Sequence, residues 1–112
     1  MKKIIYNKLI RDKIPEIIRN DNQIPKIQIL KKKEFIKELK NKVLEEGKEL
    51  IEAKTKKEIL DELIDLQELI VYIIKENKIS KSEITRKRKE KNKNRGSFKK
   101  RLFLEYVKDV KK

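Results

Sequence analysis

The chain has 112 residues, of which 37% are hydrophobic and 46% are charged, and its formal net charge at pH 7 is +14. This length allows one modest core, so we expect a single domain over residues 1–112. Cysteine and histidine are both absent, which excludes disulfides, thiolate nucleophiles, Cys/His zinc sites and imidazole bases.

The first third of the chain mixes irregular and short regular elements. Residues 1–12 have turn and extended character. Pro15 suits the first turn of a short helix that continues through Ile17 and Ile18 and ends at residues 20–22. Residues 25–30 alternate in polarity, which predicts a short strand. From about Lys33 to Ala53 the apolar residues recur at helical spacing.

Two capping signatures mark the start of the next helices. Thr55 and Glu58 form a capping box that opens a helix from about Lys56 to Glu76, and Ser80 with Glu83 opens another that ends near Asn94. Gly96 stops this last helix, and residues 101–107 are expected to form a terminal strand or an extended arm.

The two long helices are joined by a very short connection, so we expect an antiparallel hairpin. The predicted fold is mainly all-α. The hairpin completes a four-helix-bundle type of core by oligomerisation, and the N- and C-terminal segments are short and extended.

Membrane segments are not expected. The N-terminal residues lack the apolar core of a signal peptide, and the longest apolar run, Leu69–Ile74, is far too short to span a bilayer. We therefore expect a cytoplasmic protein without a membrane partner.

Acidic residues interrupt the apolar pattern of the first long helix. Ile36, Leu39, Val43 and Leu50 form one stripe, and helical geometry places Glu46 within it and Glu49 at its margin. A carboxylate that faces a core costs several kcal/mol unless it is paired or bound to a cation.

The second long helix contributes a matching pair. Glu62 and Asp65 are spaced i, i+3, which puts both on one face about one turn apart. Its apolar residues fall on two sides of the helix, so burial on both is expected. Four converging carboxylates without histidine are typical of a hard-cation site, and Mg²⁺, or alternatively Mn²⁺, is the expected ligand. The alternative is that these acids form a solvated face that is paired with lysines.

The charge is distributed unevenly along the chain. Nine acids and four lysines lie between residues 45 and 69, whereas eleven Lys/Arg and two Glu lie between residues 81 and 101. An acidic centre followed by a basic arm fits a metal–polyphosphate site. A compositional bias toward Lys, Ile and Asn explains the excess charge equally well.

Three motifs resemble a known family. The two acids of Glu45–Glu46 with Glu49, followed by Glu62-x-x-Asp65, are similar to the signature of the MazG-type nucleotide pyrophosphohydrolases, all-alpha enzymes of the phosphoribosyl-ATP pyrophosphohydrolase-like superfamily. Residues 6–15 (YNKLIRDKIP) and residues 95–101 (RGSFKKR) resemble the opening and closing motifs of its small house-cleaning subgroup. Gly47 departs from the pattern, since a helix-forming residue is usual there. An interior glycine costs about 1 kcal/mol, and we expect it to permit the close approach of a neighbouring helix.

The resemblance implies a role for each matching residue. The implied metal ligands are Glu46, Glu49, Glu62 and Asp65, and Glu45 is the implied water-activating acid. The implied contacts to substrate phosphates are Lys42, Lys91 and Arg95, with Lys8, Arg11 and Lys13 as weaker candidates for substrate or partner-subunit contact.

The resemblance also implies the reaction, which is hydrolysis of a nucleoside triphosphate, canonical or not, to a monophosphate and pyrophosphate. A homodimer or homotetramer is expected, and nucleic acid is not expected as the main partner. Two alternatives remain: a nucleic-acid-binding protein that uses the basic residues 86–101, and a non-catalytic interaction module built on the hairpin.

Overall fold

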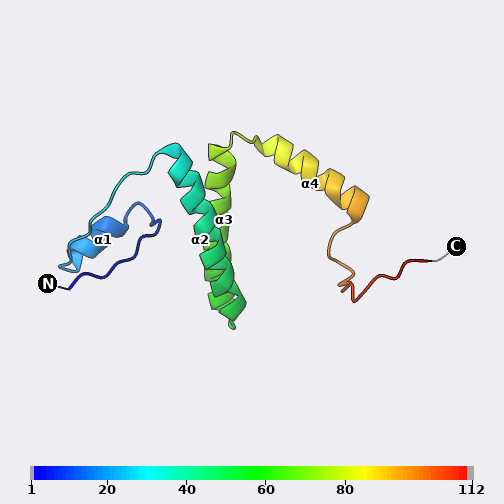
Figure 1. Ribbon diagram of the computed structural model, residues 1–112, viewed down its shortest axis with the longest axis horizontal. Coiled ribbons are helices and arrows are strands. Elements are labelled where there is room, and N and C mark those ends of the chain that lie inside the picture. The colour runs from blue at the N-terminus through cyan, green and yellow to red at the C-terminus, as the bar shows by residue number, and fades with distance from the viewer. Residues whose placement is uncertain (1, 111–112) are drawn as a thin grey trace. The chain divides into compact units, whose positions relative to one another are not determined.

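The computed structural model describes residues 2–110, which contain four helices and no strand. The helices are α1 (Ile14–Asn20), α2 (Lys32–Glu52), α3 (Lys56–Glu76) and α4 (Lys81–Arg95) (Figure 1). The all-α prediction is confirmed. The strand predicted at residues 25–30 is wrong, because no other segment of the described chain pairs with it and an alternating pattern alone does not form a ladder. Residues 101–107 likewise form no strand, which leaves the extended-arm alternative.

The helix α3 begins at the predicted capping box. The Thr55 hydroxyl accepts a hydrogen bond from the Glu58 backbone N–H, and the Glu58 carboxylate accepts one from the Thr55 backbone N–H, both at 3.1 Å. Only residues 53–55 separate α3 from α2, so the two helices form the expected antiparallel hairpin and lie side by side (Figure 1).

The core of this hairpin is small. Leu39 of α2 and Leu69 of α3 are its buried apolar side chains, with exposed fractions of 2% and 8%. Near the same level, Phe35 and Tyr72 meet edge to face with ring centroids 6.5 Å apart. The antiparallel register therefore places the start of α2 against the end of α3.

The other apolar side of α3 remains uncovered in the single chain. This α3 apolar face consists of exposed side chains, namely Leu60, Leu63, Ile70 and Val71. The sequence predicts burial on two sides of the helix. The structure buries the side that faces α2, and the second side has no cover from the described residues.

Gly47 lies in the middle of α2. A Cβ atom built at this position meets no atom within 4 Å among the described residues. Within this chain no helix approaches Gly47 closely, so the expectation that it permits a close helix approach is not met by α3 and stays a prediction for a partner subunit.

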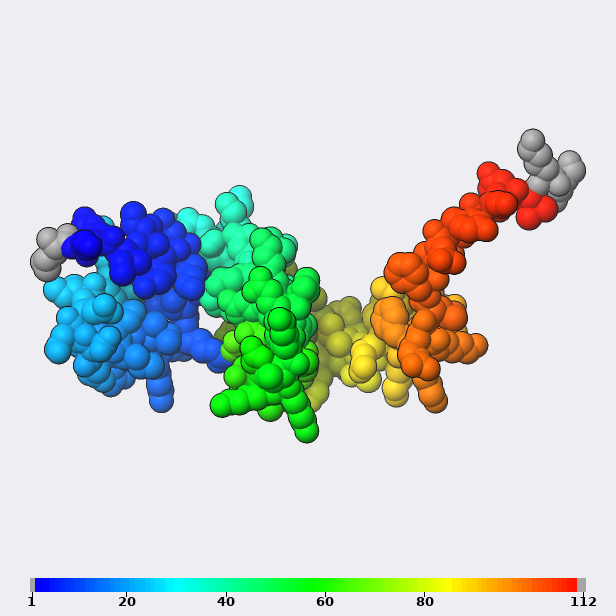
Figure 2. All heavy atoms as spheres, turned by 90° about the horizontal axis from the view of Figure 1, so that it is seen from below, coloured from blue at the N-terminus to red at the C-terminus, as the bar shows by residue number. Residues whose placement is uncertain are grey.

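The chain divides into two compact units, one up to Lys78 and one from Ile79 onward. In the second unit, the Ser80 hydroxyl caps α4 by accepting from the Glu83 backbone N–H at 3.1 Å, and Gly96 ends the helix with a positive φ of 83°. Residues 101–110 then form no helix or strand and run as a narrow strip of atoms (Figure 2). No helix in the described residues has the length and apolar composition needed to cross a bilayer.

Candidate metal centre

Glu46 is the buried charged residue of the hairpin. It lies on α2 two turns after Leu39, on the face that packs against α3, and its exposed fraction is 5%. Its Oε2 atom has no hydrogen-bond partner, and the same is true of Glu62 Oε2 on α3. Two buried carboxylate oxygens without a partner are a costly arrangement that a bound cation would relieve.

The acids form two groups that share Glu46. Carboxylate oxygens of Glu45, Glu46 and Glu49 lie within 4.8 Å of one another, and so do those of Glu46, Glu62 and Asp65. The antiparallel register produces this arrangement, because it brings the middle of α2 opposite the first half of α3. The four predicted ligands thus come together from both helices.

Burial dominates the electrostatics of this cluster. Desolvation, together with the neighbouring carboxyl groups of Glu62 and Glu49, raises the pKa of Glu46 from 4.5 to about 8. Without a cation, Glu46 therefore keeps its proton at neutral pH. Carboxylates that crowd in this way favour either a shared proton or a divalent ion.

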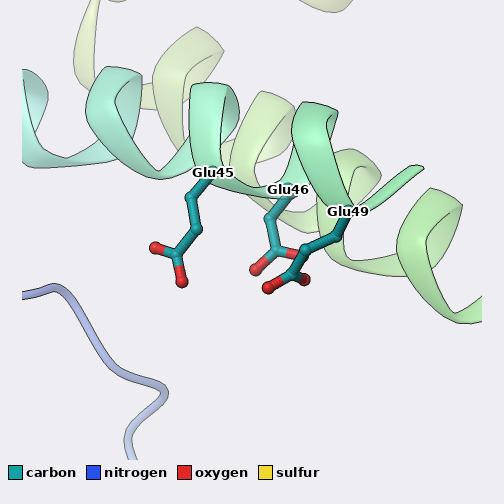
Figure 3. A group of neighbouring side chains, drawn as sticks. All are labelled: Glu45, Glu46 and Glu49. Carbon is teal, nitrogen blue, oxygen red and sulfur yellow. The ribbon is translucent and has the colours of Figure 1, made fainter. Parts of the chain in front are cut away.

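Glu45 lies beside Glu46 and Glu49 on the same side of α2, and its carboxylate is directed toward the chain around Lys8 (Figure 3). Its side chain is 35% exposed and therefore accessible to water. Lys42 Nζ lies 3.6 Å from one Glu45 oxygen and 3.9 Å from Glu46 Oε1. Lys42 therefore lies beside the acids, one turn earlier on α2, and its contact to substrate phosphates stays a prediction.

Two further cations reach the acids from the N-terminal segment (residues 2–13). Lys8 Nζ lies 3.4 Å from Glu45 Oε1, and Arg11 Nη2 lies 2.7 Å from Asp65 Oδ1. The sequence marks both residues as contacts to a substrate or partner subunit but gives no sign that they pair with the acids. These contacts span 37 and 54 residues, so local sequence patterns do not report them. The N-terminal motif and the opposite charges were the only features of the sequence that pointed to them.

For three of the predicted basic residues the structure gives no contact with the acids that tests their role. Lys13 precedes α1 and forms no ion pair with an acid within residues 2–110. Lys91 and Arg95 lie one turn apart on α4, in the unit that begins at Ile79. Their role at the acidic cluster stays a prediction.

Comparisons with known proteins bear on the chemistry of this cluster. Searches of curated proteins and of solved structures give no match. The model of one protein family matches residues 14–92, which is most of the chain and includes α1, the α2–α3 hairpin with all its acids, and most of α4. The helical hairpin and the paired acids, together with this match, show that the chain belongs to the phosphoribosyl-ATP pyrophosphohydrolase family and indicate a pyrophosphohydrolase-type activity.

Proposed function

We propose that this protein hydrolyses a nucleoside triphosphate to a nucleoside monophosphate and pyrophosphate, with Mg²⁺ or Mn²⁺ as cofactor. One observation carries the proposal: in a pyrophosphohydrolase-family chain, Glu46 is buried with an oxygen that has no partner, among other carboxylates on two helices. The alternative of a solvated acidic face does not account for this burial.

The residues present fit a divalent cation. Glu46, Glu49, Glu62 and Asp65 offer oxygen ligands only, which is the donor set that Mg²⁺ and Mn²⁺ prefer. When bound, such an ion supplies charge neutralisation at the phosphate oxygens and makes a nearby water more acidic.

The remaining residues of the chain have separate tasks. Glu45, half-buried and accessible to water, accepts a proton from the water that attacks the α-phosphorus. The bond between the α-phosphorus and its bridging oxygen breaks, and pyrophosphate leaves. Lys42 lies beside this carboxylate and contacts the phosphate chain. For Lys91 and Arg95, the same role rests only on the resemblance of residues 95–101 to the closing motif of the house-cleaning subgroup.

The uncovered α3 apolar face supports an oligomer. Leu60, Leu63, Ile70 and Val71 lie on one helix with exposed fractions between 44% and 54%. A second hairpin, packed on this face, would remove these side chains from water and complete a four-helix bundle. We therefore propose that the active protein is a homodimer, or a homotetramer built from such dimers.

The test is a panel of canonical and modified nucleoside triphosphates, with phosphoribosyl-ATP included because the family model bears its name. Purified chain is incubated with and without Mg²⁺, and both products are identified. We expect Mg²⁺-dependent release of a monophosphate and pyrophosphate in equal amounts. Release of orthophosphate, or no turnover of any compound, would contradict the proposal.

A matched pair of variants ties the activity to the site. Glu49→Ala is expected to abolish turnover while the helical circular dichroism is unchanged, because Glu49 is exposed and carries no packing. Glu52→Ala, one turn later and also exposed, is the control and is expected to retain activity. If the chain were instead a nucleic-acid-binding or non-catalytic module, neither variant would have an activity to lose.

A further inference from the structure

The N-terminal segment reaches the candidate metal centre through its cationic side chains. Arg11 Nη2 donates to Asp65 Oδ1 at 2.7 Å, and Lys8 Nζ approaches Glu45 at 3.4 Å. The backbone bends just before Lys8, where Asn7 has a φ of 45°. This left-handed conformation is one that asparagine tolerates better than most residues. The segment is thus held at the rim of the acids by two charged contacts.

Arg11 uses an acid that the cation would need. Asp65 belongs to the group of three carboxylates that could share one ion. A guanidinium and a divalent cation repel each other, and both draw on the lone pairs and charge of the same carboxylate. Arg11 does not satisfy the interior of the cluster, because the Oε2 atoms of Glu46 and Glu62 still have no partner. Arg11 therefore offsets the negative charge of Asp65 at the exposed edge of the cluster, and the buried oxygens of Glu46 and Glu62 remain available to a small ion.

We propose that Arg11 exchanges partners during cofactor and substrate binding: it pairs with Asp65 in the cation-free protein, and it moves to the substrate's phosphate oxygens once a divalent ion is bound. This inference rests on the proposed function. The guanidinium suits both roles, because it makes paired hydrogen bonds to carboxylates and to phosphates alike.

The exposure of the pair makes such an exchange easy. The side chains of Arg11 and Asp65 are 53% and 37% exposed. Ion pairs this accessible to water are weak, so they hold a segment in place without locking it. When such a weak ion pair competes with a cation for Asp65, the affinity of the site for the cation falls by roughly two- to fivefold.

The exchange predicts effects of opposite sign on two ligands. In the full chain, Arg11→Gln is expected to bind Mn²⁺ alone about two- to fivefold more tightly than the wild type, because the competitor is gone. At saturating Mg²⁺, the same variant is expected to bind inorganic pyrophosphate about tenfold more weakly, because a charge-assisted hydrogen bond is lost. Both affinities are measured by isothermal titration calorimetry.

The control is Lys3→Gln, which removes one positive charge from the same segment. Lys3 is exposed and forms no ion pair among residues 2–110, so it corrects for long-range electrostatics. An Arg11→Gln affinity for Mn²⁺ equal to that of Lys3→Gln, or weaker than wild type, overturns the exchange. An unchanged pyrophosphate affinity overturns the phosphate contact.

If the wild type binds no Mn²⁺ at all, the metal centre itself fails. Normal Mn²⁺ binding with no effect of Arg11→Gln refutes only the exchange.

Discussion

Replacing Glu46 with Gln separates the stability of the fold from cation binding. Gln has nearly the same shape as Glu but carries no charge to bury. The pKa of Glu46 is raised from 4.5 to about 8 in the folded protein. The carboxyl group therefore destabilises the cation-free fold at every pH at which it is ionised in the unfolded chain.

The size and sign of the effect follow from these two pKa values. Well below pH 4.5 Glu46 is protonated in both states, so its ionisation adds no penalty. Between pH 4.5 and pH 8 the unfolded chain releases the proton and the folded chain keeps it, so stability falls by about 1.4 kcal/mol per pH unit. At pH 7 the accumulated penalty is about 3 kcal/mol, and above pH 8 it no longer grows.

Urea unfolding followed by circular dichroism measures this penalty. In EDTA, Glu46→Gln is expected to exceed the wild type in free energy of unfolding by about 3 kcal/mol at pH 7 and by less than about 1 kcal/mol at pH 5. Saturating Mg²⁺ is expected to narrow or reverse the difference at pH 7, since the ion stabilises only the ionised cluster.

The control for this experiment is Glu52→Gln, an exposed position on the same helix, for which no pH-dependent difference is expected. All measurements use one protein concentration, because an oligomer's stability depends on it. A Glu46→Gln difference of equal size at pH 5 and pH 7 would refute the reasoning, since a pure packing effect does not vary with pH.

Four further outcomes test the rest of the structure. Asp65→Ala is expected to abolish Mg²⁺-dependent pyrophosphate release while the helical circular dichroism is retained; residual cation-dependent turnover would remove it from the site. Gly47→Ala is expected to raise the free energy of unfolding by about 0.5–1 kcal/mol, because a Cβ there meets no atom within 4 Å; a loss of stability in the same urea assay would indicate that a second subunit packs there. Thr55→Ala is expected to cost about 1 kcal/mol by chemical denaturation, since it removes the hydroxyl that accepts from the Glu58 backbone N–H and leaves only the backbone half of the capping box; no change would mean that the cap is not needed. Val71→Glu is expected to lower the mass measured by sedimentation equilibrium, and an unchanged mass would place the subunit contact elsewhere.

Local chemistry made the helices predictable from the sequence. The side-chain caps at Thr55 and Ser80 and the stop at Gly96 fix three helix boundaries through hydrogen bonds within a few residues, and the structure has all three. The strand expected at residues 25–30 failed because a strand exists only with a partner, which is a non-local condition that alternation does not report.

The site was predictable where it depends on helical spacing. Glu46 and Glu49 lie one turn apart on α2, and Glu62 and Asp65 lie one turn apart on α3. The short connection between the helices brings the two pairs together. The contact from Arg11 to Asp65 was not predictable, because it depends on the path of a segment without regular structure across 54 residues of separation. The burial of Glu46 was predictable from its place in an apolar stripe. Its lack of a hydrogen-bond partner was not, because it depends on how the side chains of both helices pack.

The two faces of α3 connect the stability of the fold with its chemistry. One face carries Glu62, Asp65 and Leu69 against α2, and the other presents Leu63 and Val71 without cover. Two buried leucines are too small a core to offset the conformational entropy of ordering a hairpin that also contains a buried, uncompensated carboxyl group. We therefore expect part of the free energy that the acids cost to be offset from outside the single hairpin. Binding of the proposed cation would remove the penalty at its source, and the proposed second subunit would bury the apolar face that the single chain leaves exposed. Since each stabilises the same helix from an opposite side, occupancy of the metal centre and subunit association should reinforce each other.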